Sequence, residues 1–109
     1  AALPTGPASG LVRRLFPVPA DHFGHFADPR PRFPMRYLDD TTFCPLNATA
    51  GCPIIFYPGN EAPITAFANA SGRLFELAER FSARVIFAEE RYYGESIPPC
   101  AEAAVDSGA

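Results

Sequence analysis

Residues 54–88 read IIFYPGNEAPITAFANASGRLFELAERFSARVIFA. The segments 54–57 and 85–88 are short continuous apolar runs, a pattern typical of strands that are buried on both faces. Between them, apolar side chains recur at spacings of three and four residues, which predicts one face of a helix: Leu74, Leu77, Ala78 and Phe81. Strand, helix and strand within about 30 residues form a βαβ unit, so we expect parallel strands and a right-handed crossover.

The polar residues of the predicted helix support the same assignment. Charged side chains fall mostly on its opposite side: Arg73, Glu76, Glu79 and Arg80. Asn69 or Ser71 is the candidate N-terminal cap, since both side chains can accept a hydrogen bond from a free backbone N–H.

The first half of the chain contains weaker signals. Residues 11–26 mix apolar side chains with Pro17 and Pro19, which predicts a short edge strand because proline cannot donate a hydrogen bond inside a sheet. Residues 33–38 alternate apolar and polar side chains and predict a second strand. We expect flexible or connecting segments at residues 1–10, 28–31 and 39–51.

Composition excludes several classes of protein. The chain has 109 residues, of which 48% are hydrophobic and 19% charged, with a net charge of −3. That balance is unlike a disordered chain, and no apolar run is long enough to span a membrane. Nine arginines, no lysine and twelve acids make an electrostatic nucleic-acid footprint unexpected. Residue 1 is Ala, and no leader pattern follows it, so either a leader has been removed or the sequence begins inside a gene. Residues 101–109 are small and polar and have no pattern that closes a domain, so we expect a fragment with a truncated tail.

Cysteines and glycosylation sequons indicate an oxidising compartment. Cys44 and Cys52 bracket a short loop that a disulfide would close, and Cys100 would then need a partner beyond residue 109. Asn47 and Asn69 each begin an Asn-Ala-Thr or Asn-Ala-Ser sequon. Each tripeptide is weak alone, but together with the cysteine pair they favour the secretory pathway over the cytosol.

Two segments follow the predicted parallel strands, and ligands of open α/β sheets bind beyond the carboxyl ends of such strands. The first segment is 59–61, where Gly59 allows a sharp turn that presents a backbone N–H. The second is 89–96. A Pro-Gly-Asn sequence is also an ordinary turn, so the first segment is not decisive by itself.

Four motifs taken together resemble a known family. They read DHF at 21–23, RYL at 36–38, FYPGNE at 56–61 and VIFAEERYYGES at 85–96. Their order and spacing resemble the N-terminal portion of the proline-specific serine peptidases, which comprise the lysosomal Pro-X carboxypeptidases and the type II/7 dipeptidyl peptidases. The most specific part is the structural motif Arg91, Tyr92, Tyr93, Gly94, Glu95 and Ser96. The resemblance covers about residues 15–99. Three positions depart from the family pattern, namely Pro58, Ala62 and Glu90, the last of which stands where His is more usual.

The resemblance implies an α/β-hydrolase fold, of which residues 11–100 would be an incomplete N-terminal part, with a mixed sheet and a helical insertion elsewhere. It implies a Ser-Asp-His peptidase that cleaves next to proline, works in a lysosome, a vacuole or outside the cell, and needs no cofactor. Gly59 and Asn60 would then lie on the oxyanion side of the site, because a loop after a strand supplies one such donor in this fold. Glu61 would either face the substrate or hold the loop.

The catalytic triad is expected downstream of this chain. The family's Gly-Gly-Ser-Tyr-Gly elbow is absent, and Ser96 lacks the strand-to-helix context and runs into Pro98. His22 and His25 precede the predicted βαβ unit, so neither fits the Ser, Asp, His chain order; His22 is expected to be structural and bonded to backbone. No metal site is expected.

The segment after the second predicted strand also carries charge. Glu89 and Glu90 beside Arg91 predict a structural ion-pair cluster, in which Arg91 ties the strand end to a neighbouring loop while Tyr92 and Tyr93 pack there.

Three functional hypotheses remain at the level of sequence. The first is the N-terminal fragment of a luminal or secreted serine exopeptidase, inactive alone, that acts on peptides with proline near a terminus. The second is a catalytically inactive glycoprotein of the same fold that serves as a binding module. The third is a small independent secreted domain. Carboxypeptidase and dipeptidyl peptidase action both remain open, as does a homodimer.

Overall fold

The computed structural model describes residues 10–23, 31–45, 47 and 51–98. These residues form a four-stranded sheet and two helices. The elements in chain order are β1 Val12–Pro19, β2 Arg32–Asp40, β3 Ile54–Tyr57, α1 Ile64–Ala70, α2 Gly72–Phe81 and β4 Arg84–Ala88. The predictions for residues 1–9, for the tail at 101–109, and for His25 and Cys100 lie outside the described residues. None of the described helices is long and apolar enough to cross a membrane.

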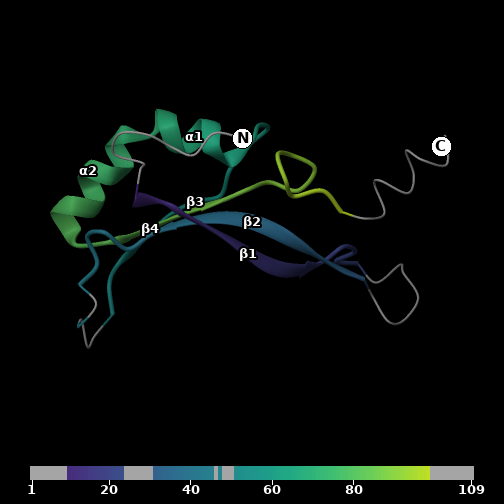
Figure 1. Cartoon of the computed structure of the whole chain (residues 1–109), viewed down its shortest axis with the longest axis horizontal. Coiled ribbons are helices and arrows are strands. Elements are labelled where there is room, and N and C mark those ends of the chain that lie inside the picture. Colours follow the sequence, from purple (N-terminus) through teal and green to yellow (C-terminus); the bar gives the residue numbers. More distant parts are fainter. Residues whose placement is uncertain (1–9, 24–30, 46, 48–50, 99–109) are drawn as a thin grey trace.

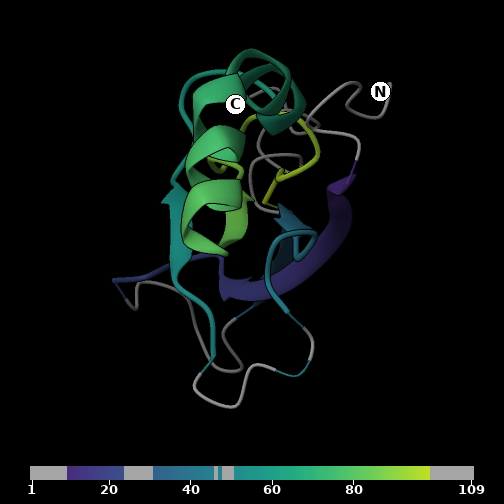
Figure 2. The same cartoon turned by 90° about the vertical axis from the view of Figure 1, so that its left-hand side faces the viewer.

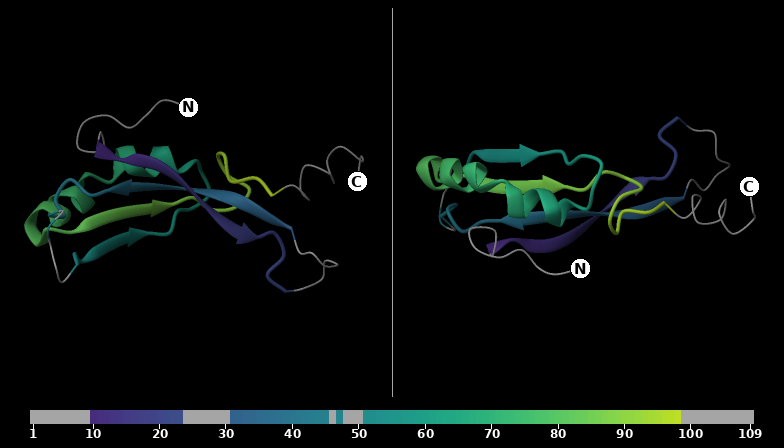
Figure 3. Two further views of the ribbon diagram at one scale, coloured as in Figure 1. Left: turned by 60° about the horizontal axis from the view of Figure 1, so that its bottom comes forward. Right: turned by 90° about the horizontal axis from the view of Figure 1, so that it is seen from above.

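The sheet is mixed, and its strand order is β1-β2-β4-β3 (Figure 3, left). β3 and β4 are parallel, as the βαβ pattern predicted. β1 pairs antiparallel with β2, and β2 pairs antiparallel with β4. The two prolines of β1 are accommodated because this strand lies at the edge of the described sheet, which confirms the edge-strand prediction.

Both helices cover one face of the sheet (Figures 1 and 2). The core lies between the helices and this face of the sheet, and its largest members are Leu11, Leu38, Ile64, Phe75 and Phe87. The rings of Phe75 and Phe87 stack with centroids 5.8 Å apart, which joins α2 to β4. This burial holds the carboxyl ends of β3 and β4 at a fixed position under α1.

β3 differs from its prediction. The apolar run predicted a strand buried on both faces, but Ile54 and Phe56 are each 58% exposed. Only Ile55 and Tyr57 pack against the core under the helices. The reason is that β3 is an edge strand here, and no described element covers the opposite face of the sheet.

β2 runs further than predicted. Asp39 and Asp40, expected to begin a loop, are the last two residues of the strand and are both buried. Their carboxylates have partners that compensate the burial: Asp39 accepts hydrogen bonds from Arg14 and Arg84, and Asp40 accepts two from Thr42.

The helical region is divided into two helices, and the predicted apolar face is partly wrong. Asn69 lies inside α1. Ser71 is the residue directly before α2, but its side chain makes no cap, because its hydroxyl donates to the carbonyl of Phe67. The buried residues of α2 are Phe75 and Ala78. Phe81 is 58% exposed because it is the last residue of the helix, where the chain turns away through Ser82 in a left-handed conformation.

A disulfide joins Cys44 to Cys52, as predicted, with the two Cα atoms 5.8 Å apart. It links the segment after β2 to the segment before β3.

Candidate active site

A hollow of about 370 Å³ lies where β3 and β4 end. Because the two strands are parallel, their carboxyl ends meet at one edge, and the loops that follow them form the two walls. The lining residues are Gly59, Asn60, Glu61, Glu90, Arg91, Tyr92 and Tyr93. The structure therefore brings together the two segments that the sequence placed at the strand ends.

Gly59 is required by its surroundings. Its φ is +79°, and a Cβ atom built there would overlap the carbonyl oxygen of Ala88. The first loop thus packs directly on the backbone at the end of β4. The side chain of Asn60 accepts a hydrogen bond from the N–H of Glu61 at 2.8 Å, and its carbonyl accepts one from Ala62 at 2.7 Å. These contacts order the loop around the turn that glycine permits.

Glu89, directly after β4, is buried and carries the densest set of hydrogen bonds at this edge. Its carboxylate accepts from the guanidinium of Arg36 at 2.5 and 3.2 Å and from the N–H of Ile64 at 3.0 Å. It also accepts from the N–H of Glu95 at 3.0 Å and the hydroxyl of Ser96 at 2.8 Å. Burial acts to raise the pKa of Glu89, but these hydrogen bonds outweigh burial and hold the pKa below its ordinary value.

The network continues outward through Arg36 and Glu95. Arg36 also contacts the carboxylate of Glu95, which in turn accepts hydrogen bonds from Arg13 of β1. The hydrogen bond from Arg13 is the main cause that lowers the pKa of Glu95. Gly94 has a φ of +55°, and a Cβ at this position would overlap the carboxylate of Glu89.

Ser96 is not placed as a nucleophile. It is 0% exposed; its hydroxyl donates to Glu89 and accepts from the backbone N–H of Arg36 at 2.9 Å. A nucleophile must reach substrate. The expectation that Ser96 has no catalytic role agrees with this geometry.

Arg91 ties the second loop to the end of β1, as expected. Its guanidinium donates to the carbonyls of Pro19 and Ala20 at 3.0 and 2.9 Å and lies over the ring of Phe33 at 5.2 Å. The predicted cluster of Glu89, Glu90 and Arg91 is wrong, because Glu89 turns inward to Arg36 and Glu90 is exposed. The sequence offered one signal for this pair, an arginine inside the alternating strand 33–38.

His22 differs from its prediction. Its Nε2 lies 2.6 Å from Nη2 of Arg91, a side-chain partner rather than the expected backbone one. A guanidinium only donates, so Nε2 acts as the acceptor.

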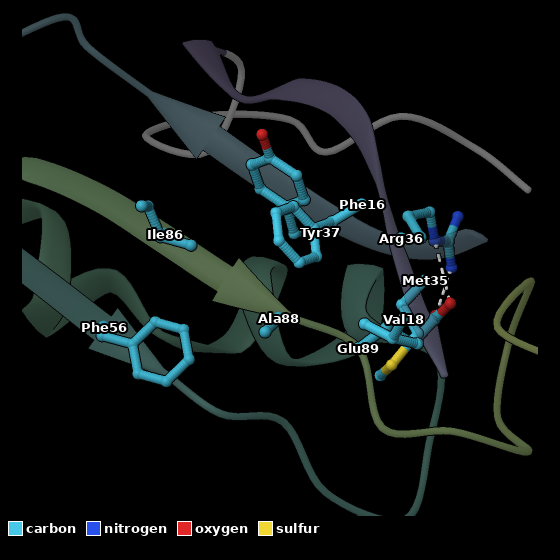
Figure 4. Close-up of a pocket in the computed structure, with 9 residues that line it drawn as sticks. All are labelled: Phe16, Val18, Met35, Arg36, Tyr37, Phe56, Ile86, Ala88 and Glu89. Carbon is cyan, nitrogen blue, oxygen red and sulfur yellow. Dashed lines mark hydrogen bonds and ion pairs between the residues drawn. The ribbon is translucent and has the colours of Figure 1, made fainter. Parts of the chain in front are cut away.

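A second hollow of about 240 Å³ opens on the sheet face opposite the helices (Figure 4). Its walls are apolar, with Phe16, Met35, Phe56 and Ile86 among them. The charged pair at its rim, Arg36 and Glu89, is already joined, as the dashed lines in Figure 4 show. This hollow therefore offers little charge for chemistry, unlike the hollow at the strand ends.

Comparison with known protein families identifies the class of protein to which the chain belongs. Residues 19–105 match the serine carboxypeptidase S28 family, a range that includes both walls of the hollow, and the chain belongs to this family.

Individual relatives agree with the family match. The chain is 46% identical over 83 residues to the lysosomal Pro-X carboxypeptidase of Mus musculus, covering 76% of this chain and 16% of that protein. It is 39% identical over 102 residues to the lysosomal Pro-X carboxypeptidase of Homo sapiens, covering 88% of this chain and 20% of that protein. A putative serine protease, pcp-1, of Caenorhabditis elegans is 44% identical over 78 residues, covering 72% of this chain and 13% of that protein. The chain spans at most about a fifth of the length of these relatives.

Proposed function

We propose that this chain is part of an α/β-hydrolase that acts as a serine exopeptidase and removes a residue that follows proline at the C-terminus of a peptide. The observation that supports the proposal most directly is the family match across both loops of the hollow at the strand ends. The names of the relatives favour carboxypeptidase over dipeptidyl peptidase action. The Ser, Asp and His of the triad would come from chain outside these residues.

Within this proposal, Gly59 and Asn60 contribute backbone N–H groups to the oxyanion side of the site. A donor about 3 Å from the developing oxyanion stabilises it, and removing such a donor typically lowers kcat by about 10²–10³-fold. The left-handed turn at Gly59 and its packing on Ala88 support this assignment, because they fix the direction of the loop backbone. Glu61 is exposed and lines the hollow, which supports a role facing substrate.

The protein is proposed to work in a lysosome, a vacuole or outside the cell. The Cys44–Cys52 disulfide requires oxidising conditions during folding, and two of the relatives carry "lysosomal" in their names. Asn47 and Asn69 are both exposed, so they remain accessible candidates for glycosylation.

The test uses the full-length gene product with three probes. A fluorophosphonate reports a reactive serine. A peptide ending in Pro-Phe is offered with a free carboxylate and as its amide, and a Gly-Pro anilide with a free amine tests dipeptidyl peptidase action. We expect the fluorophosphonate to label the protein. Of the three substrates, we expect only the Pro-Phe peptide with the free carboxylate to be cleaved. Labelling with cleavage of the anilide alone would make the enzyme a dipeptidyl peptidase, and no labelling would favour the binding-only alternative.

Two glycine variants test the oxyanion assignment. Gly59→Ala places a Cβ against Ala88 and moves the loop, so we expect kcat to fall by about 100-fold with KM little changed. Gly51→Ala is the matched control, since Gly51 has a similar φ of +76° but open space around its Cβ position. An equal loss of kcat in both variants would contradict the assignment.

A further inference from the structure

Both walls of the hollow at the strand ends are tied to one buried carboxylate. Glu89 accepts from the N–H of Ile64, which follows the first loop, and from the N–H of Glu95 and the hydroxyl of Ser96 in the second. Its remaining partner, Arg36, belongs to the neighbouring strand β2. Three other segments of the chain therefore converge on the side chain of Glu89.

The first loop depends on this carboxylate at its far end. The residue before α1 is Pro63, whose side chain makes no cap, so the N–H of Ile64 has no acceptor within its own helix. Ile64 is fully buried, and without Glu89 this N–H would lose its hydrogen bond away from water. At its near end the loop rests on the backbone of Ala88 through Gly59. The loop is thus held on both sides by the end of β4.

We propose that Glu89 is a positioning residue for the reaction, which holds the 59–61 loop and the 91–96 loop in fixed relation so that the oxyanion donors keep their direction. The effect of Glu89 on the oxyanion donors rests on the proposed function. Its role in holding the two loops together rests on its hydrogen bonds alone. Glu89 touches no substrate, since its side chain is 0% exposed.

The chemistry of the carboxylate explains why glutamate suits this position. Both of its oxygens only accept, and every partner around it donates. Glu89→Gln replaces one oxygen with an NH₂ group, which faces at least one of these donors and has nothing to bond. Glu89→Asp keeps the charge beside Arg36 but is one methylene shorter, so it cannot reach both loops with the same contacts.

The experiment compares Glu89→Gln and Glu89→Asp with Asp39→Asn in the full-length gene product. Asp39 is the matched control, because it is also buried, is paired with Arg14 and Arg84, and lines neither wall of the hollow. Hydrogen exchange is followed in peptides that cover 59–64 and 91–96. Kinetics are measured with the Pro-Phe peptide and normalised to the fraction of protein that the fluorophosphonate labels.

We expect Glu89→Gln to raise exchange in both loops at least tenfold and to lower kcat about 100-fold with KM nearly unchanged. For Glu89→Asp, both the exchange in the two loops and kcat should lie between the values of Glu89→Gln and those of the wild type. Asp39→Asn should leave exchange in both loops and kcat within about threefold of the wild type. If Glu89→Gln does not fold, the intermediate loss in Glu89→Asp still decides the question.

Unchanged exchange in the two loops of the Glu89 variants, or a loss of kcat equal to that of Asp39→Asn, would overturn the proposal. If the wild type neither labels nor cleaves, the proposed function fails and the reaction role with it. The exchange comparison would then still show whether Glu89 clamps the two loops.

Discussion

Gly94 shows how one residue without a side chain controls the turn after β4. Its backbone has a φ of +55°, and the space where a Cβ would lie is taken by the carboxylate of Glu89 and the guanidinium of Arg36. A larger residue would therefore meet both backbone strain and a buried ion pair.

Gly94→Ala is expected to destabilise the full-length protein by at least about 2 kcal/mol, since the left-handed conformation alone costs about 1–2 kcal/mol for a residue with a Cβ. The measurement is the free energy of unfolding in urea. Gly72→Ala serves as the control, because nothing lies within 4 Å of its Cβ position at the start of α2. That variant should stay within about 0.5 kcal/mol of the wild type. Equal stability of the two variants would show that the turn tolerates a side chain.

At the scale of elements, Arg91 fastens the end of β1 to the loop after β4. It does so with two N–H groups on two carbonyls and with its plane over Phe33. The ammonium group of lysine has neither the fixed pair of N–H donors nor the flat face of a guanidinium. Arg91→Lys should therefore lower the free energy of unfolding by about 1–2 kcal/mol, measured in urea. Arg73→Lys, on the exposed face of α2, should change it by less than about 0.5 kcal/mol. If both variants had the same free energy of unfolding as the wild type, the contacts of Arg91 would not contribute to stability.

The disulfide acts on the connection between β2 and β3. Its cysteines are 8 residues apart in sequence, so the bridge closes a short loop. In the chain-entropy view, a loop of this length contributes about 2.5 kcal/mol by restricting the unfolded chain. The double variant Cys44→Ser and Cys52→Ser should lose about this amount in a urea titration, and dithiothreitol should lower the stability of the wild type by more than that of the variant. An equal loss of stability in both proteins would show that the effect of the reductant comes from another disulfide.

Sequence reasoning succeeded where the signal was local. The apolar runs predicted β3 and β4 and their parallel directions, and the prolines of β1 predicted an edge strand, because these patterns lie within short stretches of sequence. The exposure of Ile54 and Phe56 was missed because it depends on whether another element covers their face of the sheet, and none of the described elements does. The pairing of Glu89 with Arg36 was missed because it joins residues 53 positions apart. Arg91 is much nearer in the sequence and was therefore predicted as the partner.

At the scale of the whole molecule, three of the described carboxylates, which connect strands and loops, have pKa values below their ordinary range. For Asp39 the leading cause is the hydrogen bond from Arg84, and for Glu95 it is the one from Arg13. For Glu89, hydrogen bonds from its donors exceed the opposing effect of burial. A carboxyl whose pKa is lowered by folding stabilises the fold above its unfolded pKa, and that contribution is lost as pH falls through the folded pKa.

The ordinary values are 3.8 for Asp39 and 4.5 for Glu89, so stability should be level above about pH 5 and fall steadily below about pH 4.5. The free energy of unfolding in urea between about pH 3 and pH 7 tests this. Asp39→Asn should be less stable than the wild type at neutral pH, and the difference should shrink in acid. Stability that rises on acidification below pH 4.5 would contradict the assigned directions.

The hydrogen bonds around Glu89 also have a consequence for the order of events during synthesis. β1 and β2 are neighbours along the chain, so their antiparallel pair can form as soon as residue 40 is free of the ribosome. The partner of Arg36 is Glu89, which is synthesised 53 residues later. The last donors to Glu89 along the chain are Glu95 and Ser96. A nascent chain stalled before residue 89 should therefore remain open to protease, whereas one stalled well beyond residue 96 can close the sheet around its buried arginine.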